Sequence, residues 1–319
     1  MKKFTKLLTV ILTVLLLATF VVGCSSQNGE VAETNELKTE KTVEETGFPL
    51  KISDDAQREV EIKEKPERIV SLVPSNTEIL FALGLGDKVV GVTDFCDFPK
   101  EATSKEKIGG FSDPNIEKII ELKPDLVLGT GMHQKLISQL EDVGLTVFIF
   151  DPKGINDVLK SIETVGTLTG QTDTSEKLVS EMNEKIDEVK GKVADLTDEQ
   201  KPLVYYEVWN DPIMTVGPGA LMYEIIEMAG GQNIAADFKE DYPQLSLEVL
   251  IEKDPQVIVA SAGSMSEPGK VKERKGWEDI SAVKEGKVYV IEEDKVVRAG
   301  PRIADGLVDV AKIIHPELY

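Results

Sequence analysis

Short apolar runs and longer amphipathic segments alternate through most of this chain. The runs are rich in β-branched residues and are bounded by glycine, proline and aspartate, which is typical of buried strands. The segments between them repeat apolar residues every three or four positions, as helices do. The predicted strands occupy residues 69–73, 89–92, 126–128, 146–150, 204–208, 257–259 and 288–290, and a last helix covers residues 301–314. This alternation predicts an α/β fold with mainly parallel sheets and with ligand sites at the carboxyl ends of the strands.

The segment 68–93, RIVSLVPSNTEILFALGLGDKVVGVT, is the clearest strand–helix–strand unit. A proline ends the first strand, and the side-chain oxygens of Ser75, Asn76 and Thr77 are expected to cap the helix that follows. Glu78 is expected in the first helical turn, where a negative charge suits the helix dipole. Because Ser75 and Asn76 follow the carboxyl end of a strand, they are also predicted to form part of the floor of a ligand site.

A long polar helix is predicted over residues 173–197, midway along the chain. Asp173 and Glu176 have the spacing of a capping box at its start. The apolar residues of this helix form one narrow stripe, made of Leu178, Met182, Ile186, Val189 and Val193. One apolar stripe fits a rigid connector between two lobes, and the alternative is an ordinary surface helix within a single domain.

Two pairs of segments are similar to each other within the chain. Residues 116–128, IEKIIELKPDLVL, match residues 247–259, LEVLIEKDPQVIV, and Glu117 aligns with Glu248. The helix EILFALG of the first unit has a counterpart in EIIEMAG, which ends at Gly230. Such repeats predict two related lobes, each with its own sheet, over residues 48–172 and 198–319. Two lobes joined by one helix leave a cleft between them, which is a favoured place for a ligand.

The first residues of the chain have the pattern of an export signal. Lysines at the start precede an apolar run of 16 residues, 7–22, which is shorter than the ~20 residues of a membrane-spanning helix. The run ends at Gly23 and Cys24, a pattern that resembles a bacterial lipobox and implies a signal peptide over residues 1–23 and a lipid anchor on Cys24. The acidic segment 24–47 is predicted to be a flexible tether. The alternative is an ordinary signal peptide, or an uncleaved anchor, with an incidental cysteine.

Net charge and cysteine content narrow the function further. The formal net charge is −21, which argues against nucleic acid and anionic lipid surfaces as partners. The chain has two cysteines, so if Cys24 is lipidated, Cys96 has no partner for a disulfide and is interpreted as a small packed residue.

Several segments together carry a family resemblance. They are the lipobox pattern, the connecting helix and the motifs RIVSLVPSNTEILFALG, IEKIIELKPDLVL, GPGALMYEIIEMAGGQNIAAD, YPQLSLEVLIEKDPQVIV and GPRIADGL. From residue 48 to the end, the chain resembles the solute-binding proteins of ABC importers for vitamin B12, ferric siderophores and haem.

The resemblance implies two Rossmann-like lobes bridged by one long helix, with a ligand cleft between the lobes. It also implies little closure on binding, no catalysis and no cofactor of the protein's own, although the ligand itself can carry cobalt or iron. The expected partners are an ABC permease with its ATPase, and the expected location is the extracytoplasmic face of the cell membrane. Glu117 and Glu248 match the glutamates that dock onto arginines of the permease in this family. Their alternative role is a favourable interaction with the helix dipole, worth ~0.3–1 kcal/mol each.

The same resemblance places a set of side chains around the cleft. Aromatic walls there suit a large flat ring system, so a corrinoid is the preferred ligand, with a ferric siderophore or haem as the alternative. Siderophore binders of this family use cleft arginines, and Arg302 lies in the matching region together with Arg298. Thr130 departs from the aromatic pattern of the B12 binders. The predicted ligand-binding residues are Ser75, Asn76, Phe95, Phe111, His133, Trp209, Tyr242 and Arg298.

Each of these residues has a plainer interpretation. The aromatic residues can anchor loops on the core, and Arg298 can pair with Asp294. His133 is a candidate axial ligand to cobalt or iron, because neutral imidazole is a common metal ligand.

Two other functional classes compete with a receptor for a large organic ligand. The first is an exported hydrolase that uses Glu207 and Asp211 as a carboxylate pair, but the chain lacks the G-x-S-x-G and H-E-x-x-H patterns and a phosphate-binding glycine loop. The second is a receptor for a bare transition-metal ion, and the two histidines of the chain are too few for a His-rich site.

Overall fold

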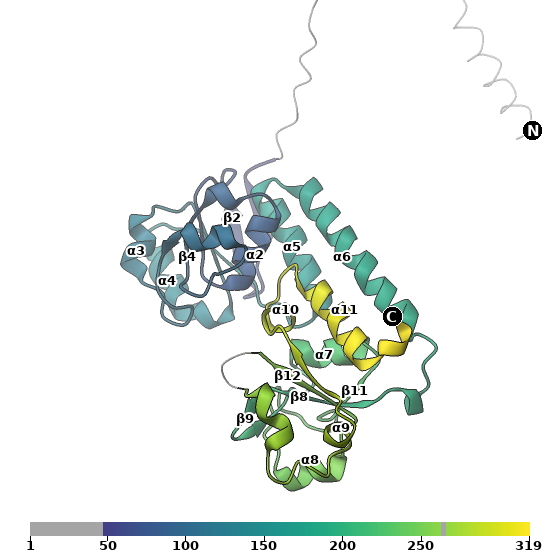
Figure 1. The fold of residues 1–319 in the computed structure, drawn as a ribbon. Coiled ribbons are helices and arrows are strands. Elements are labelled where there is room, and N and C mark those ends of the chain that lie inside the picture. Colours follow the sequence, from purple (N-terminus) through teal and green to yellow (C-terminus); the bar gives the residue numbers. More distant parts are fainter. Residues whose placement is uncertain (1–46, 263–265) are drawn as a thin grey trace, which may run out of the picture. The chain divides into compact units, whose positions relative to one another are not determined.

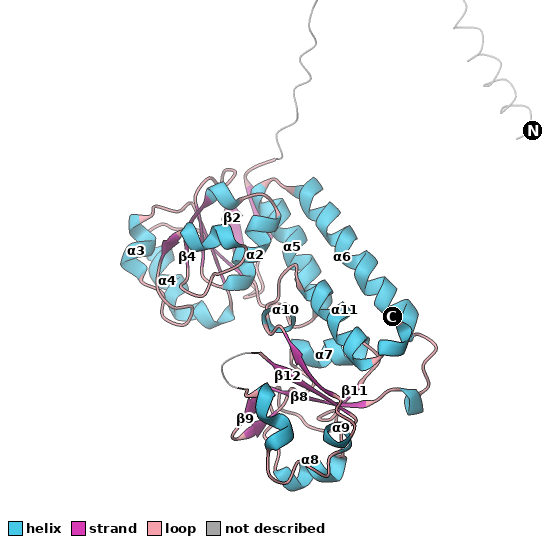
Figure 2. Ribbon diagram, in the orientation of Figure 1, coloured by secondary structure: helices cyan, strands magenta, loops and turns pink. Residues whose placement is uncertain are grey.

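Two parallel sheets organise residues 47–262 and 266–319, which are the residues that the structure, a computed structural model, describes. Strands and helices alternate along the chain, so the predicted α/β class is confirmed (Figure 2). All of the described residues fall within one compact unit of the chain. The predicted signal peptide, the lipidation of Cys24 and nearly all of the predicted tether lie outside the described residues.

The first sheet has five parallel strands in the order β5-β4-β3-β6-β7. The chain starts at β3, adds two strands on one side, and then crosses to the other side at β6. An antiparallel hairpin of β1 (Leu50–Ser53) and β2 (Glu59–Ile62) precedes this sheet. The elements are β3 (Ile69–Ser71), α2 (Pro74–Ala82), β4 (Val89–Val92), β5 (Glu106–Lys107), α3 (Ile116–Glu121), β6 (Leu126–Gly129), α4 (Gln134–Asp142) and β7 (Val147–Ile149).

The second sheet repeats this plan with four parallel strands in the order β11-β8-β12-β13. It again starts in the middle, at β8, and changes direction at β12. The elements are β8 (Leu203–Glu207), α7 (Leu221–Met228), β11 (Gln232–Asn233), α8 (Leu247–Lys253), β12 (Val257–Ser261), α9 (Ser281–Lys284), β13 (Val288–Ile291) and α10 (Asp294–Val297), with a small ribbon of β9 (Trp209–Asn210) and β10 (Ile213–Met214). In both sheets the change of direction opens a crevice at the carboxyl ends of the strands, where parallel sheets bind ligands.

Three helices join the two sheets. Helix α6 (Thr172–Val193) runs beside α5 (Ile155–Thr169) and α11 (Ile303–Ile314), as Figure 1 shows. Its predicted apolar stripe is buried at Met182, Ile186 and Val189. One hydrophobic core includes residues of both sheets and of all three helices. Every described strand of the first sheet precedes α6 and every described strand of the second follows it, as expected for a connecting helix. Among the described residues, no helix is both long and apolar enough to cross a bilayer.

The start of α2 differs from the prediction. The helix begins at Pro74, directly after the strand, and no side chain caps it. The amide of Asn76 instead donates a hydrogen bond to the carbonyl of Gly129 (3.2 Å), and the hydroxyl of Thr77 donates to Ser71 Oγ (2.8 Å). These side chains are buried between strands, so they hold the carboxyl edge of the sheet together and are not free to cap. Glu78 consequently lies beyond the first turn.

The capping box predicted at Asp173 is also wrong. Helix α6 begins at Thr172 after Gln171, without a side-chain cap, so Asp173 already lies inside the first turn. Side-chain caps occur instead on the two repeated helices. Asn115 accepts from the backbone N–H of Lys118 at the start of α3, and Ser246 does the same for Val249 at the start of α8.

The packing of α5 on α6 yields a stability prediction at Gly166. A Cβ added to Gly166 would lie 2.5 Å from Ser175 Cβ, closer than real Cβ contacts, and 3.2 Å from the carbonyl oxygen of Gln171, closer than most of them. We expect Gly166→Ala to lower the free energy of unfolding by about 1–3 kcal/mol, because the added methyl group overpacks this contact. Urea unfolding followed by circular dichroism measures the change.

Gly191 provides the matched control in α6. A Cβ at Gly191 has no neighbour within 4 Å. Gly191→Ala should therefore raise the free energy of unfolding by roughly 0.5–1 kcal/mol through helix propensity alone. If Gly166→Ala stabilised the protein as much as this control, the close approach of α5 and α6 would be refuted.

Candidate ligand-binding cleft

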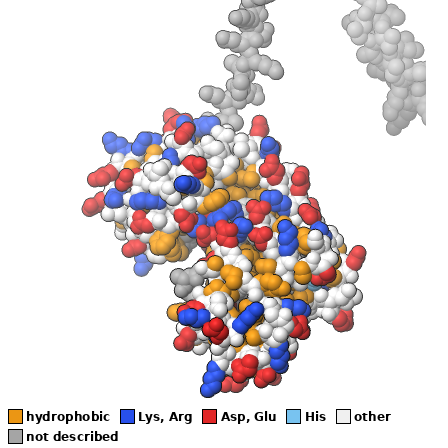
Figure 3. All heavy atoms as spheres, viewed as in Figure 1, with side chains coloured by type: hydrophobic (Ala, Val, Ile, Leu, Met, Phe, Trp, Pro, Cys, Tyr) orange, Lys and Arg blue, Asp and Glu red, His pale blue; other side chains and the backbone are white. Residues whose placement is uncertain are grey.

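Large apolar side chains are exposed next to the carboxyl ends of strands in both sheets. Soluble proteins seldom expose contiguous groups of such side chains without a function. Phe95 follows β4 and is 54% exposed, and Tyr242, beside the β9–β10 ribbon, is 55% exposed. The others are Phe98 after β4, Met132 after β6, Trp209 after β8 and Val297 after β13. Figure 3 shows hydrophobic side chains gathered on both lobes, with charged side chains between them.

The N-terminal lobe supplies one aromatic wall. The rings of Phe95 and Phe111 meet edge to face, with their centroids 5.2 Å apart. His133 holds Phe111 in place, because its Nε2 lies 2.8 Å from the Phe111 carbonyl oxygen. The other ring nitrogen, Nδ1, lies 3.0 Å from the backbone nitrogen of Thr130 and accepts its N–H. This pattern assigns the proton to Nε2, which donates to Phe111.

His133 is thus a positioning residue for the aromatic wall. Its side chain is buried, and burial lowers the pKa of its imidazole below the ordinary value of 6.5, so the ring is neutral. Both ring nitrogens are already hydrogen-bonded, which leaves neither of them free for cobalt or iron. The geometry therefore does not support the axial-ligand hypothesis.

The C-terminal lobe contributes an apolar cavity of about 220 Å³. Tyr242 and Val297 lie on its border, and the only charged residue in its lining is Glu293. Val208, which also lines the cavity, directly precedes Trp209. The remaining lining residues are Tyr206, Val216, Ala220, Leu221, Met222 and Val296. Of the predicted ligand residues of this lobe, Tyr242 lines the cavity, whereas Trp209 and Arg298 each directly follow a lining residue in the sequence.

An ion cluster connects the two walls. The buried carboxylate of Glu78 in α2 accepts from Arg302 Nε (2.9 Å) and Nη2 (2.7 Å), and from Arg298 Nη1 (3.1 Å). Arg298 also pairs with Asp97 (2.7 Å) and with Asp294 (2.9 Å), as its plainer interpretation predicted. Arg302 also contacts Glu292 (3.0 Å) and stacks over the Phe98 ring, 4.1 Å from its centroid. We call these six charged residues, with two arginines and four carboxylates, the Glu78 cluster.

Electrostatics favour the paired, charged state of Arg298 and Asp97, whereas burial raises the pKa of Asp294. Burial works against a charged Arg298, but hydrogen bonds to Asp97 and Glu78 raise the pKa of its guanidinium above the usual value. Burial also works against a charged Asp97, and the hydrogen bond from Arg298 outweighs it, so the pKa of Asp97 is lowered. Both guanidiniums are thus engaged by carboxylates of the protein.

Ser75, Asn76 and Cys96 lie near the carboxyl edge of the first sheet. Ser75 is half-buried at the point where the lobes approach each other, since a Cβ on Gly300 would lie 3.5 Å from the Ser75 carbonyl oxygen. Asn76 is buried, and its amide is engaged by Gly129. These two residues support the edge of the sheet, and the contacts found for them are with the protein. Cys96 is buried beside Thr77 (3.1 Å), which fits a packed residue.

Glu117 and Glu248 occupy equivalent and exposed positions. Each lies in the first turn of its helix, α3 or α8, two residues after the capping side chain of Asn115 or Ser246. Backbone and Ser246 hydrogen bonds lower the pKa of Glu248. The internal repeat thus presents one carboxylate on each lobe.

The carboxylate pair of the hydrolase hypothesis does not form a reactive site. Glu207 is fully buried, and its carboxylate is taken up by Arg274 and by the hydroxyl of Ser266 (2.5 Å). Asp211 is exposed on the turn between β9 and β10. Among the described residues, no three His, Cys, Asp or Glu side chains are grouped to hold a metal ion.

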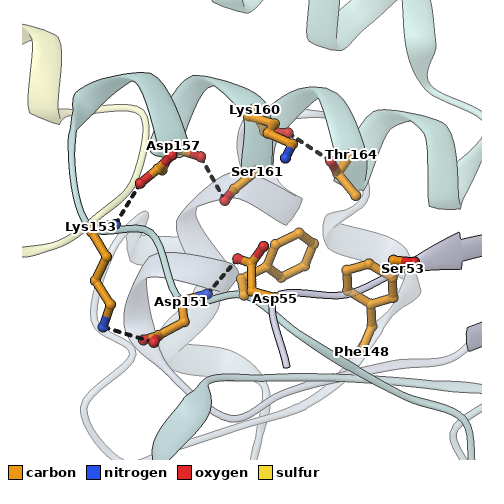
Figure 4. Close-up of a pocket in the computed structure, with 10 residues that line it drawn as sticks. Ser53, Asp55, Phe148, Asp151, Lys153, Asp157, Lys160, Ser161 and Thr164 are labelled. Carbon is orange, nitrogen blue, oxygen red and sulfur yellow. Dashed lines mark hydrogen bonds and ion pairs between the residues drawn. The ribbon is translucent and has the colours of Figure 1, made fainter. Parts of the chain in front are cut away.

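A larger cavity, of about 300 Å³, lies between β7 and α5 and is shown in Figure 4. Some of its charged side chains already have partners within the protein. Lys153 pairs with Asp151 (2.8 Å), and Asp55 accepts from the backbone N–H of Asp151 (2.7 Å). None of the predicted ligand residues lines it.

Sequence reasoning named Arg298 and Arg302 but missed Glu78, Asp97 and Phe98 as members of the site. Arg298 and Glu78 are 220 residues apart, and no local pattern signals such a pairing. The one available signal was Glu78 itself, an acidic residue directly before the apolar helical segment 79–83.

The neutral state of His133 yields a pH prediction. In the unfolded chain a histidine titrates near 6.5, whereas folded His133 has a lower pKa, so only the unfolded chain takes up a proton as pH falls through 6.5. The contribution of His133 to stability is therefore complete above pH 6.5 and declines below it. The stability difference between wild type and His133→Gln should shrink between about pH 7.5 and pH 5, and NMR should report a pKa below 6.5 for His133. A difference that is independent of pH would contradict this assignment.

The comparisons agree with this geometry. The family model described as "Periplasmic binding protein" matches residues 69–295. The uncharacterized ABC transporter substrate-binding lipoprotein YvrC of Bacillus subtilis is 37% identical over 311 residues, which cover 96% of each chain. The vitamin B12-binding protein of Vibrio cholerae is 31% identical over 248 residues, covering 76% of this chain and 87% of the other.

Solved structures show the same fold with different ligands in their names. The periplasmic vitamin B12-binding protein BtuF of Vibrio cholerae has a TM-score of 0.68 and 29% identity, covering 79% of this chain and 97% of the other. The periplasmic heme-binding protein RhuT of Roseiflexus has a TM-score of 0.71 and 25% identity, covering 79% and 99%. A possible iron-binding protein of Staphylococcus epidermidis has a TM-score of 0.69 and 30% identity, covering 79% and 100%.

The resemblance noted in the sequence is therefore confirmed. The two parallel sheets match the fold of solved periplasmic binding proteins. The chain belongs to the periplasmic binding protein family, among the ABC-importer solute-binding proteins whose members include vitamin B12, haem and iron binders.

Proposed function

We propose that this chain captures a corrinoid in the cleft between its lobes and delivers it unchanged to an ABC permease. The observation that carries this proposal is the pairing of exposed aromatic walls with arginines that are already neutralised. Phe95, Trp209 and Tyr242 offer apolar ring surface to a large flat ligand. Arg298 and Arg302 offer no free positive charge, because carboxylates of the protein surround each guanidinium.

The size of the apolar surface supports a large ligand. Pockets for drug-sized molecules measure roughly 300–1,000 Å³, and the apolar cavity of the C-terminal lobe measures about 220 Å³. A ligand seated there must also cover the exposed rings of Trp209 and Phe95 outside the cavity to bury most of its surface. A corrin ring with its nucleotide arm is large enough for this. The relatives named for vitamin B12 and cobalamin support the same ligand class.

A ferric siderophore or haem is the second candidate, and the names of iron-binding and heme-binding structures favour it. Both ligands usually carry negative charge, and Arg298 and Arg302 are already paired with carboxylates of the protein, so an anion gains little from them. His133 has no free ring nitrogen to ligate haem iron. These two observations rank the corrinoid first.

The family supplies the transport partner, because a substrate-binding protein of an ABC transporter delivers its ligand to a permease. Glu117 and Glu248 are exposed at matching positions of the two lobes, so we assign them to docking on basic residues of a permease. The proposed location is the extracytoplasmic face of the cell membrane, with Cys24 as the lipid-bearing residue. The lipoprotein relative supports this location.

Ligand titration tests the proposed ligand. Cyanocobalamin, haemin and a panel of ferric siderophores are added separately while tryptophan fluorescence is followed. We expect cyanocobalamin to bind with a Kd below about 1 µM and to quench Trp209, which is 39% exposed after the carboxyl end of β8. Trp277 is buried under Arg274 and should keep its emission.

The matched variant is Trp209→Phe, which keeps an aromatic ring but removes the reporter. It should lose most of the fluorescence change and still bind cyanocobalamin by calorimetry. Tight binding of haemin or a siderophore instead would replace the corrinoid, and failure of the whole panel would reject all three ligand classes.

Charge reversal tests the docking role. The double variant Glu117→Arg, Glu248→Arg should abolish ligand uptake by cells and leave ligand affinity unchanged, because both residues lie outside the cleft. The control is Glu163→Arg, Glu184→Arg, which makes the same charge change at exposed positions of α5 and α6. Loss of ligand affinity in the first variant, or equal loss of uptake in both, would rule out docking through this pair.

A further inference from the structure

One charged side chain in the Glu78 cluster has no solvent to stabilise it. The side chain of Glu78 is 1% exposed, and it accepts hydrogen bonds from two arginines of the opposite lobe. Burying a carboxylate is expensive unless it is paired, so this position is held at a cost that the fold tolerates. Among the four carboxylates of the cluster it is the one shared closely by both arginines, within 3.1 Å of each.

We propose that Glu78 determines ligand specificity by occupying the guanidinium groups that an anionic ligand would otherwise bind. This inference deepens the proposed function and rests on it only in taking the space between the walls as the ligand site. Arg302 Nε and Nη2 form the two-pronged contact with Glu78 that arginine makes with any carboxylate or comparable anion. The carboxylate of Glu78 thus occupies the position on Arg302 that the carboxylate of a ligand would take.

The cluster adjoins the surface that a ligand would touch. Arg298 directly follows Val297, which borders the apolar cavity, and Asp97 lies two residues after Phe95. The ring of Phe98 covers the guanidinium of Arg302 at 4.1 Å. An anion lying between the walls would therefore come close to both arginines.

The remaining carboxylates add to the exclusion. Asp97, Asp294 and Glu292 also contact the two arginines, so four carboxylates face two guanidiniums, a formal excess of two negative charges. Lys295 does not offset this excess, because it pairs with Glu292 and with a further acid, Asp309. Like charge near the binding surface repels an anion and discriminates against it.

The test compares the affinity for an anionic probe in wild type and in Glu78→Gln. The probe is the trianionic ferric tris-catecholate complex, measured by calorimetry at low and high salt. We expect Glu78→Gln to bind it at least about tenfold more tightly than wild type at low salt, a gain of about 1.4 kcal/mol. Salt should reduce this gain, because screening weakens charge interactions.

Two further variants separate charge from packing. Adding Arg298→Gln to Glu78→Gln should remove most of the gain, since it removes a cation that Glu78 had neutralised. Asp305→Asn is the control, because it removes one negative charge from the exposed pair with Lys185, outside the cluster, and should not change the affinity for the probe.

Asp97→Asn provides a second test of the same charge effect. If Glu78→Gln fails to fold, Asp97→Asn serves in its place, because the Asp97 side chain is 62% exposed and still pairs with Arg298. It should give a smaller, salt-sensitive gain in affinity for the anionic probe.

A folded variant whose affinity for the probe does not rise, or rises by an amount that salt does not affect, would overturn the proposal. Cyanocobalamin is titrated in parallel, so failure of the corrinoid assignment shows in wild type, whereas failure of the Glu78 assignment shows in the ratio between variants.

Discussion

The arrangement of this protein depends on the burial of one face of α6. That helix has a narrow apolar stripe, and the stripe can be covered only if α5 of the first lobe and α11 of the second lie along it together. Because side chains of both sheets reach the same hydrophobic core, the carboxyl ends of their strands are held in a fixed relation. The candidate cleft is thus set by helix packing before any ligand arrives, which limits the ordering cost of binding.

The Glu78 cluster forms a second connection between the lobes, made of charges. It links α2 to α10 and to the start of α11 at the edge of the cleft. Buried ion pairs of this kind contribute little net stability compared with apolar residues of similar volume, but they fix geometry and choose among partners. The two connections therefore have different consequences: the apolar one holds the lobes together, and the ionic one gives the space between them an acidic character.

The α/β class, the two lobes and the stripe on α6 could be predicted because they rest on local periodicity and on an internal repeat. The details of the site could not. Ser75, Asn76 and Thr77 have the composition of a helix cap, yet burial recruits Asn76 and Thr77 to strand contacts. His133 has the chemistry of a metal ligand, but the fold uses its Nε2 for the loop that carries Phe111 and its Nδ1 for the backbone of Thr130. In each case a tertiary hydrogen bond decided the role, and such bonds have no signature in a single sequence.

The shared core also bears on how the molecule unfolds. The chain passes between the sheets once, through α6, which would usually suggest two halves able to melt separately. However, Ile162 of α5, Val189 of α6 and Val310 of α11 are buried in one cluster. Unfolding of either sheet would therefore expose apolar side chains that pack against the other sheet. We therefore expect the two lobes to unfold as one cooperative unit. A ligand that contacts only one wall would consequently protect the backbone of both lobes against exchange with solvent.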